Sequence, residues 1–217
     1  MNTMNKIACV RLFRLVAAGL SVLALAACAT LHPATMPSTA FYALEGAPLG
    51  LVPTRLSAAP TLMVNPTSAA AGFDSPHIIY VREAHKLEYF AHNEWVDTPA
   101  RMLAPLLVAA LENTGAFRAV LLSPSSASAD LRLDTEIIRL QQEFLTRPSS
   151  VRFTLRAYLV DDKTRRVLAW REFDAVVPAA SEGPYGGVIA ANRAVQTVLE
   201  ELSAFCAEAA RSLRVKN

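Results

Sequence analysis

Residues 151–159 read Val-Arg-Phe-Thr-Leu-Arg-Ala-Tyr-Leu, and this stretch decides the fold. Apolar side chains occupy every odd position, whereas the even positions carry arginine, threonine or tyrosine. Successive side chains of a strand point to opposite faces of its sheet, so the alternation predicts a strand with one buried and one solvated face. Asp161-Asp162-Lys163-Thr164 predicts a turn, and residues 166–177 then predict the strand that returns antiparallel to the first.

Upstream of this hairpin, short runs of β-branched and aromatic residues are bounded by proline, glycine or small polar residues, which is typical of strands. Residues 77–82 and 87–90 predict a second hairpin, because only a short turn separates them. Residues 131–140 predict a strand with a bulge near Ile137, because the apolar positions change face there. Further strands are predicted over residues 61–64 and 117–122.

Two segments predict helices, since their apolar residues recur at spacings of three and four. The first begins at Asp97-Thr98-Pro99 and ends at Gly115, and the second covers residues 188–213. Pro105 lies inside the first helix and predicts a kink there, or a helix that begins close to it. Strands, helix, strands and helix in this order predict an α+β fold for residues 61–217, an antiparallel sheet with two main helices packed on one face.

Residues 1–27 predict a signal peptide. Three basic residues precede an apolar run of 13 residues ending at Ala27, which is too short to span a bilayer core of about 30 Å. Leu25-Ala26-Ala27-Cys28 resembles a bacterial lipobox, which implies a diacylglycerol on the Cys28 sulfur, cleavage before Cys28 and acylation of the new amino terminus. The alternative is an ordinary signal peptide that is cleaved after Ala24-Leu25-Ala26.

Residues 28–60 predict a lipidated tether that precedes the folded domain. Proline and alanine are abundant there, and such a segment buries too little apolar surface to offset the entropy of ordering. A short β-prone run near residues 41–44 predicts an edge strand within it. Ala29 follows the cysteine, and under the sorting rule of enteric lipoproteins, in which Asp at this position retains a protein in the inner membrane, the chain is expected in the outer membrane, facing the periplasm.

Charge and cysteine usage exclude some classes of protein. Removing residues 1–27 takes away three basic residues and no acidic one, which leaves 18 basic against 19 acidic residues, a net charge of −1. This balance gives no electrostatic footprint for nucleic acid. Cys206 is then the only cysteine besides Cys28, so no disulfide forms within a lipidated chain, and its apolar neighbours predict a buried side chain.

No motif predicts catalysis or metal binding. His77, His85 and His92 lie among acidic residues, but their spacings of seven and eight do not place them on one helical face. No HExxH, Cys-x-x-Cys, Gly-x-Ser-x-Gly or phosphate-loop pattern is present. These histidines are therefore interpreted as solvated residues around a hairpin turn, and no catalytic residue, metal ligand or cofactor is predicted.

The solvated face of the central hairpin is the candidate interaction site. Arg152, Arg156, Tyr158 and Trp170 are predicted to share it, away from the two helices. A mixed surface of arginine and aromatic side chains is typical of interfaces rather than of active sites. We therefore expect this face, or the final helix, to bind other copies of the chain or a protein partner.

The order of these segments resembles the ABC-type transport auxiliary lipoprotein family. The resemblance covers about residues 40–212 and implies a lipid-anchored periplasmic α+β domain without catalytic residues. It also implies that the protein works beside a permease, an ATPase and an MCE (mammalian cell entry) domain protein that moves lipids or other apolar molecules between two membranes. The segments that carry it are the lipobox, residues 41–44, 78–82, 87–90, 94–95, 98–102, 115–120, 151–170, 185–188 and 191–195.

Two other functions stay open from the sequence. One is an assembly or pilot lipoprotein of another envelope complex, which the same anchor and fold would serve. The other is a periplasmic hydrolase, which the lack of a paired nucleophile and base disfavours.

Overall fold

The computed structural model describes residues 38–46 and 58–216, so the predicted signal peptide and Cys28 lie outside the described residues. A compact unit begins at Thr39, and it thus includes the strand-bearing part of the segment that the sequence assigns to the tether. Its elements are β1 (Ala40–Tyr42), β2 (Thr61–Val64), β3 (Ser68–Ala69), β4 (His77–Glu83), β5 (Lys86–Trp95), α2 (Pro99–Asn113), β6 (Ala119–Leu122), β7 (Leu131–Glu143), β8 (Ser150–Asp161), β9 (Val167–Pro178) and α3 (Pro184–Lys216).

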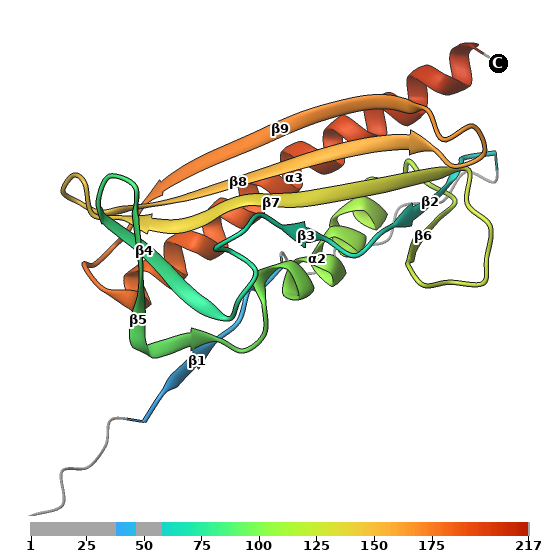
Figure 1. Ribbon diagram of the computed structural model, residues 1–217. Helices are drawn as coiled ribbons and strands as arrows, with labels where there is room; N and C mark the ends of the chain where they lie inside the picture. The colour runs from blue at the N-terminus through green and yellow to red at the C-terminus, as the bar shows by residue number, and fades with distance from the viewer. Residues whose placement is uncertain (1–37, 47–57, 217) are drawn as a thin grey trace, which may run out of the picture. The chain divides into compact units, whose positions relative to one another are not determined.

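Three long antiparallel strands, β7, β8 and β9, form one side of the sheet, with β9 at its edge (Figure 1). β8 lies between β7 and β9, and it pairs along its whole length with both. Asp161 lies at the turn before β9, where its carboxylate accepts hydrogen bonds from the backbone and side chain of Thr164. The hairpin that the alternation in residues 151–159 predicts is confirmed.

The other edge of β7 is shared by three strands in succession. β2 pairs with its first residues, β3 with its middle and β4 with its last residues, all in parallel. β6 continues the sheet beyond β2, whereas β5 and then β1 continue it beyond β4. The sheet therefore divides at β7 into two arms, and it is mixed rather than antiparallel throughout. Alternation along a strand reports which face is buried and not which strand lies beside it, so the parallel pairs could not be predicted.

A bulge in β7 keeps its apolar residues on one face. The pairing with β8 shifts between Ile137, opposite Leu155, and Arg139, opposite Thr154. Ile137 and Leu140 are consequently both buried, although an unbroken strand would place them on opposite faces. The bulge predicted near Ile137 is confirmed.

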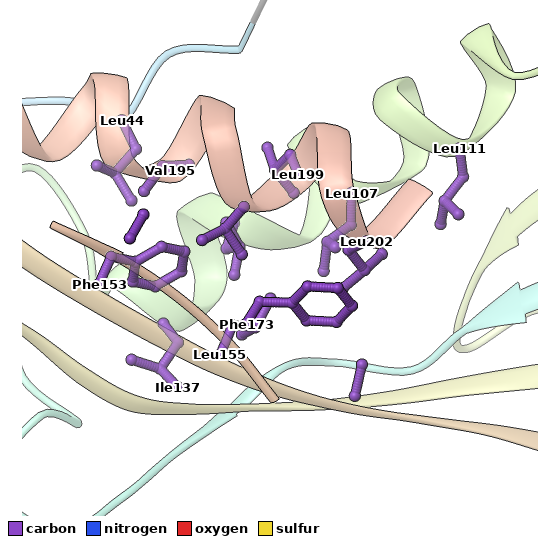
Figure 2. Packing of buried hydrophobic residues seen from close by; sticks show 14 of the residues in the cluster. Leu44, Leu107, Leu111, Ile137, Phe153, Leu155, Phe173, Val195, Leu199 and Leu202 are labelled. Carbon is purple, nitrogen blue, oxygen red and sulfur yellow. The ribbon is translucent and has the colours of Figure 1, made fainter. Parts of the chain in front are cut away.

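Both helices pack on the same face of the sheet, which confirms the predicted layering. Leu107 and Leu111 of α2 and Leu199 and Leu202 of α3 lie on the same side of the strands as Phe153 and Phe173 (Figure 2). Among these residues Leu107, Leu111, Leu202 and Phe153 have no exposed surface. We call this side of the sheet the inner face and the opposite side the outer face. Within the ranges described above, neither helix combines the length and apolarity needed to cross a membrane.

The helix boundaries differ from the predicted ones. α2 begins six residues before Pro105, so a start close to this proline is wrong, and the proline ring lies on the exposed side of the helix. Gly115 follows α2 with φ of 63°, the left-handed conformation expected of a terminating glycine. α3 begins at Pro184 rather than 188, which places two glycines in its first turn.

One of these glycines permits a close approach between helix and sheet. A Cβ at Gly187 would overlap the side-chain oxygen of Gln142, which is 2% exposed and fixed by a hydrogen bond from its Nε2 to Ser149 Oγ. The glycine-rich run therefore does not break the helix. It lets the first turn of α3 lie directly on β7.

Candidate functional site

The outer face of β8 and β9 carries all four predicted interaction residues. Tyr158 lies directly opposite Trp170, and Arg156 lies opposite Glu172 in the same pairing. Asp174 lies opposite Thr154, and Arg152 is two residues before Thr154 in β8. Side chains opposite each other in an antiparallel pair share one face, so the register brings these residues together on one surface.

The two arginines, however, are held between carboxylates of both neighbouring strands. Arg156 donates from Nη2 to Glu172 Oε2 of β9 at 2.9 Å, and its Nη1 lies 3.5 Å from Glu136 Oε2 of β7. The hydrogen bond with Glu172 raises the pKa of the Arg156 guanidinium above its ordinary value. This positive charge is therefore balanced within the sheet.

Arg152, four residues before Arg156 in β8, is held in the same way. Its Nη1 donates to Asp174 Oδ2 of β9 at 3.3 Å, and its Nε lies 3.5 Å from Glu143 Oε1 of β7. Asp174 also accepts a hydrogen bond from the Thr154 hydroxyl at 2.5 Å. The sequence pattern indicated the arginines but not these acidic partners, since finding them requires the register between strands. The alternation of charged residues in 132–136 is the one local signal that such a ladder exists.

An aromatic pair at the other end of this surface has no carboxylate partner within residues 38–46 and 58–216. The rings of Tyr158 and Trp170 stack with centroids 6.3 Å apart and planes inclined by 26°. Trp170 is 62% exposed, and Val167 and Leu168, just before it in β9, are also exposed. We call the stacked pair Tyr158 and Trp170 the aromatic patch. Trp95 differs sharply, because it is buried in the core.

The histidines do not assemble a metal centre. His77 stacks on Tyr89 with ring centroids 4.3 Å apart and lies 3.6 Å from a Glu94 carboxylate oxygen. His85 is at the exposed turn between β4 and β5, and His92 is exposed on β5. Within residues 38–46 and 58–216 no three histidine, cysteine, aspartate or glutamate side chains are placed to hold a metal ion. The structure thus places His85 and His92 as the sequence predicted, in solvent, whereas His77 is partly covered by its contacts.

Cys206 is buried on α3, as its apolar neighbours predicted. Burial raises the pKa of its thiol from 9.0 to about 12. A thiol with this pKa stays protonated at neutral pH, and the thiolate is the reactive form. Cys206 is therefore a packing residue rather than a nucleophile.

These features define a class of protein: an α+β domain with two helices on the inner face of a mixed sheet and an aromatic patch on the outer face. The chain belongs to the family of ABC-type transport auxiliary lipoprotein components, whose family model matches residues 42–203. The match covers β2 to β9, α2, the first part of α3 and the aromatic patch, which agrees with the resemblance seen in the sequence.

Solved structures show the same fold. XCC0632 from Xanthomonas campestris, a protein of the DUF330 family, matches with a TM-score of 0.71 and 23% identity over 80% of this chain and 98% of that one. An uncharacterized protein matches with a TM-score of 0.58 and 14% identity over 79% of this chain and 97% of that one. No curated protein matches the chain.

Proposed function

We propose that this protein is a lipid-anchored, non-enzymatic accessory subunit of an ABC transport system of the MCE type. In this role the protein catalyses no reaction and does not itself drive the movement of cargo. It holds an MCE-domain protein, and through it the permease and ATPase, in a path for lipids or other apolar molecules between the inner and outer membranes. Membership of the auxiliary lipoprotein family supports the general role, and the partner is our proposal.

The observation that carries the docking role is the exposure of Trp170. A tryptophan that is 62% exposed leaves a large apolar surface in water, and such side chains supply much of the binding energy at protein interfaces. The charge-balanced ladder of Arg152 and Arg156 lies beside it and provides the polar rim that surrounds an apolar contact. We infer that the aromatic patch is the contact with the MCE-domain partner or with further copies of the chain.

Cys28 is the proposed site of anchoring. A single acyl chain binds membranes only marginally, whereas the diacylglycerol and amino-terminal acyl chain implied at Cys28 together anchor stably. With Ala29 after the cysteine, we propose residence in the outer membrane with the folded domain in the periplasm. Replacing Cys28 by serine removes the sulfur that carries the diacylglycerol, so Cys28→Ser is expected to leave an unprocessed precursor without acyl label. Equal labelling of variant and wild type would contradict the anchor.

Copurification tests the docking role. The detergent-solubilised full chain is expected to retain an MCE-domain protein and a permease encoded beside it, and Trp170→Ala is expected to lose most of both. Phe41→Ala is the matched control, because Phe41 is also an exposed aromatic residue, 64% exposed, but lies on β1. Circular dichroism verifies that each variant is folded.

Two results would overturn the proposal. Full retention of the partners by folded Trp170→Ala means that the aromatic patch is idle. Copurification of a secretin or another envelope machine in place of the MCE-domain protein means that the chain is an assembly lipoprotein of that machine.

A further inference from the structure

Two loops meet at one end of the sheet, far from the aromatic patch. One is the turn between β4 and β5, and the other is the loop between β7 and β8 (Figure 1). The Phe144 backbone N–H donates to the Val81 carbonyl at 2.8 Å, and the Tyr80 and Phe144 rings meet edge to face at 5.9 Å. These contacts fix the two loops side by side.

A groove with a volume of about 360 Å³ lies between these loops and the outer face of β7. Its apolar lining includes two side chains that reach into solvent: Leu87, 47% exposed, and Leu145, 55% exposed. Phe73 and Ile138 also line the groove. Isolated exposed leucines are common, but two leucines and a phenylalanine around one groove at loop ends form an apolar surface without a cover in the described residues.

Basic side chains surround this groove. His85, Lys86 and Arg139 contribute to its lining, and Arg139 has no ion-pair partner within the part of the chain that the structure describes. The nearest carboxylate oxygens to Lys86 Nζ lie 3.7 and 4.0 Å away, on Glu88 and Glu83. Arg139 therefore differs from Lys86 and from the arginines of the ladder on the outer face, each of which lies near two carboxylates.

We propose that these two loop ends dock on the surface of a bilayer that contains anionic phospholipid. Leu87 and Leu145 enter the region between headgroups and acyl chains, while Lys86 and Arg139 contact lipid phosphates. An apolar surface with basic residues at its border is the pattern by which peripheral proteins bind anionic membranes. The Arg139 guanidinium, which has no carboxylate partner in the described residues, is available to a lipid phosphate beside the two exposed leucines.

The chain length allows this contact with the membrane that holds Cys28, a step that rests on the proposed lipid anchor. Cys28 precedes Ala40 by twelve residues, which span at most about 42 Å when fully extended. Ala40 pairs with Asn93, which lies seven residues along β5 from Lys86, or about 24 Å in a strand. The loop ends are thus within reach of the anchored membrane.

Fluorescence quenching in vesicles tests this inference with the full processed lipoprotein. Leu87→Cys and Leu145→Cys are labelled separately with an environment-sensitive fluorophore, and the protein is reconstituted in vesicles of phosphatidylcholine and phosphatidylglycerol that contain nitroxide lipids. Cys206 does not take the label, because it is buried and its thiol has a pKa of about 12. Val167→Cys is the matched control, since Val167 is equally exposed but lies at the opposite end of the long strands.

The expected result is loss of fluorescence at both loop positions and much less loss at Val167. Lys86→Glu and Arg139→Glu in the labelled Leu87→Cys chain are expected to restore fluorescence, as is removal of phosphatidylglycerol. Equal quenching at all three positions, or none at the loop positions of protein that floats with the vesicles, overturns the inference. Shielding of the labels only after a protein partner is added overturns it too, by assigning the groove to that partner. Failure to float at all contradicts the lipid anchor as well as this docking.

Discussion

The two faces of β8 are stabilised by different interactions. On the inner face Phe153, Leu155 and Ala157 have no exposed surface and pack beneath the helices. On the outer face, Arg156 and its neighbours are held by ion pairs to adjacent strands, and Tyr158 stacks on an exposed tryptophan. The odd positions of this strand therefore pack the core, whereas the side chains of Arg152, Arg156 and Tyr158 keep part of their surface in solvent.

The sharpest way to test this contrast is to delete an inner-face side chain. Phe153→Ala is expected to lower the free energy of unfolding by about 3–5 kcal/mol, because it removes a fully buried ring and leaves a cavity. Urea denaturation of the purified protein measures the loss. Tyr158→Ala, on the outer face of the same strand, is expected to cost much less, and equal losses would contradict the distinction between the faces.

The contact between α3 and the inner face offers a second test. Gly187→Ala is expected to destabilise the protein by about 1–3 kcal/mol, since its Cβ would overlap the buried oxygen of Gln142. The higher helix propensity of alanine offsets part of this cost. Adding Gln142→Ala to the glycine variant removes the overlapped atom, so the two substitutions are expected to cost less together than their sum. Thermal denaturation of the single and double variants decides this, and strict additivity would refute the clash.

A charge reversal on the outer face is expected to have a smaller effect. Arg156→Glu places a third carboxylate beside Glu136 and Glu172, so the melting temperature should fall modestly at low salt while the fold is retained. Added salt should recover part of the loss, because exposed charges are screened. Arg156→Gln lacks the repulsion and is the control. Unfolding of Arg156→Glu at every salt concentration would show that the ladder, like the inner face, is essential to the fold.

Ionisation of the Cys206 thiol is expected to have the smallest effect on the stability of the protein at neutral pH. Its pKa is about 12 in the folded protein against 9.0 as reference, so the native state holds this proton more tightly than the unfolded chain. The contribution to stability is complete below pH 9 and is lost as the pH rises toward 12. A thiol reagent at pH 8 should therefore label Cys206 only after denaturant is added. Rapid labelling of the native protein would show that the helix side of the core opens readily.

The local sequence pattern predicts most of the strands and helices, but it does not predict which strands pair with one another. The alternation in residues 151–159 and the phase change at Ile137 report burial, a property of single strands, and both predictions are confirmed. A strand of two residues such as β3 has no measurable period, so the sequence does not predict it. The three parallel strands beside β7 depend on contacts between residues far apart in the chain, which no local pattern encodes.

The candidate site shows the same division. The sequence predicted correctly that Arg152, Arg156, Tyr158 and Trp170 share a face, since that follows from period two and one hairpin. It did not separate the arginines from the aromatic pair. That separation arises because Glu143 and Glu136 reach the arginines from β7, whereas Trp170 on the edge strand has no neighbour beyond it in the described residues.

The division of the sheet at β7 has a consequence for the order in which the protein folds. β2, β3 and β4 can pair with β7 only once this later segment of the chain is present. Leu62, for example, pairs with Leu131, nearly seventy residues later in the chain. Contacts of such sequence separation slow folding, and strands that await a neighbour expose edges on which other chains can assemble. In a chain that emerges amino terminus first, β7, the strand with which these three strands pair, is therefore formed late. The rate of folding, more than the final stability, is the property that this topology limits.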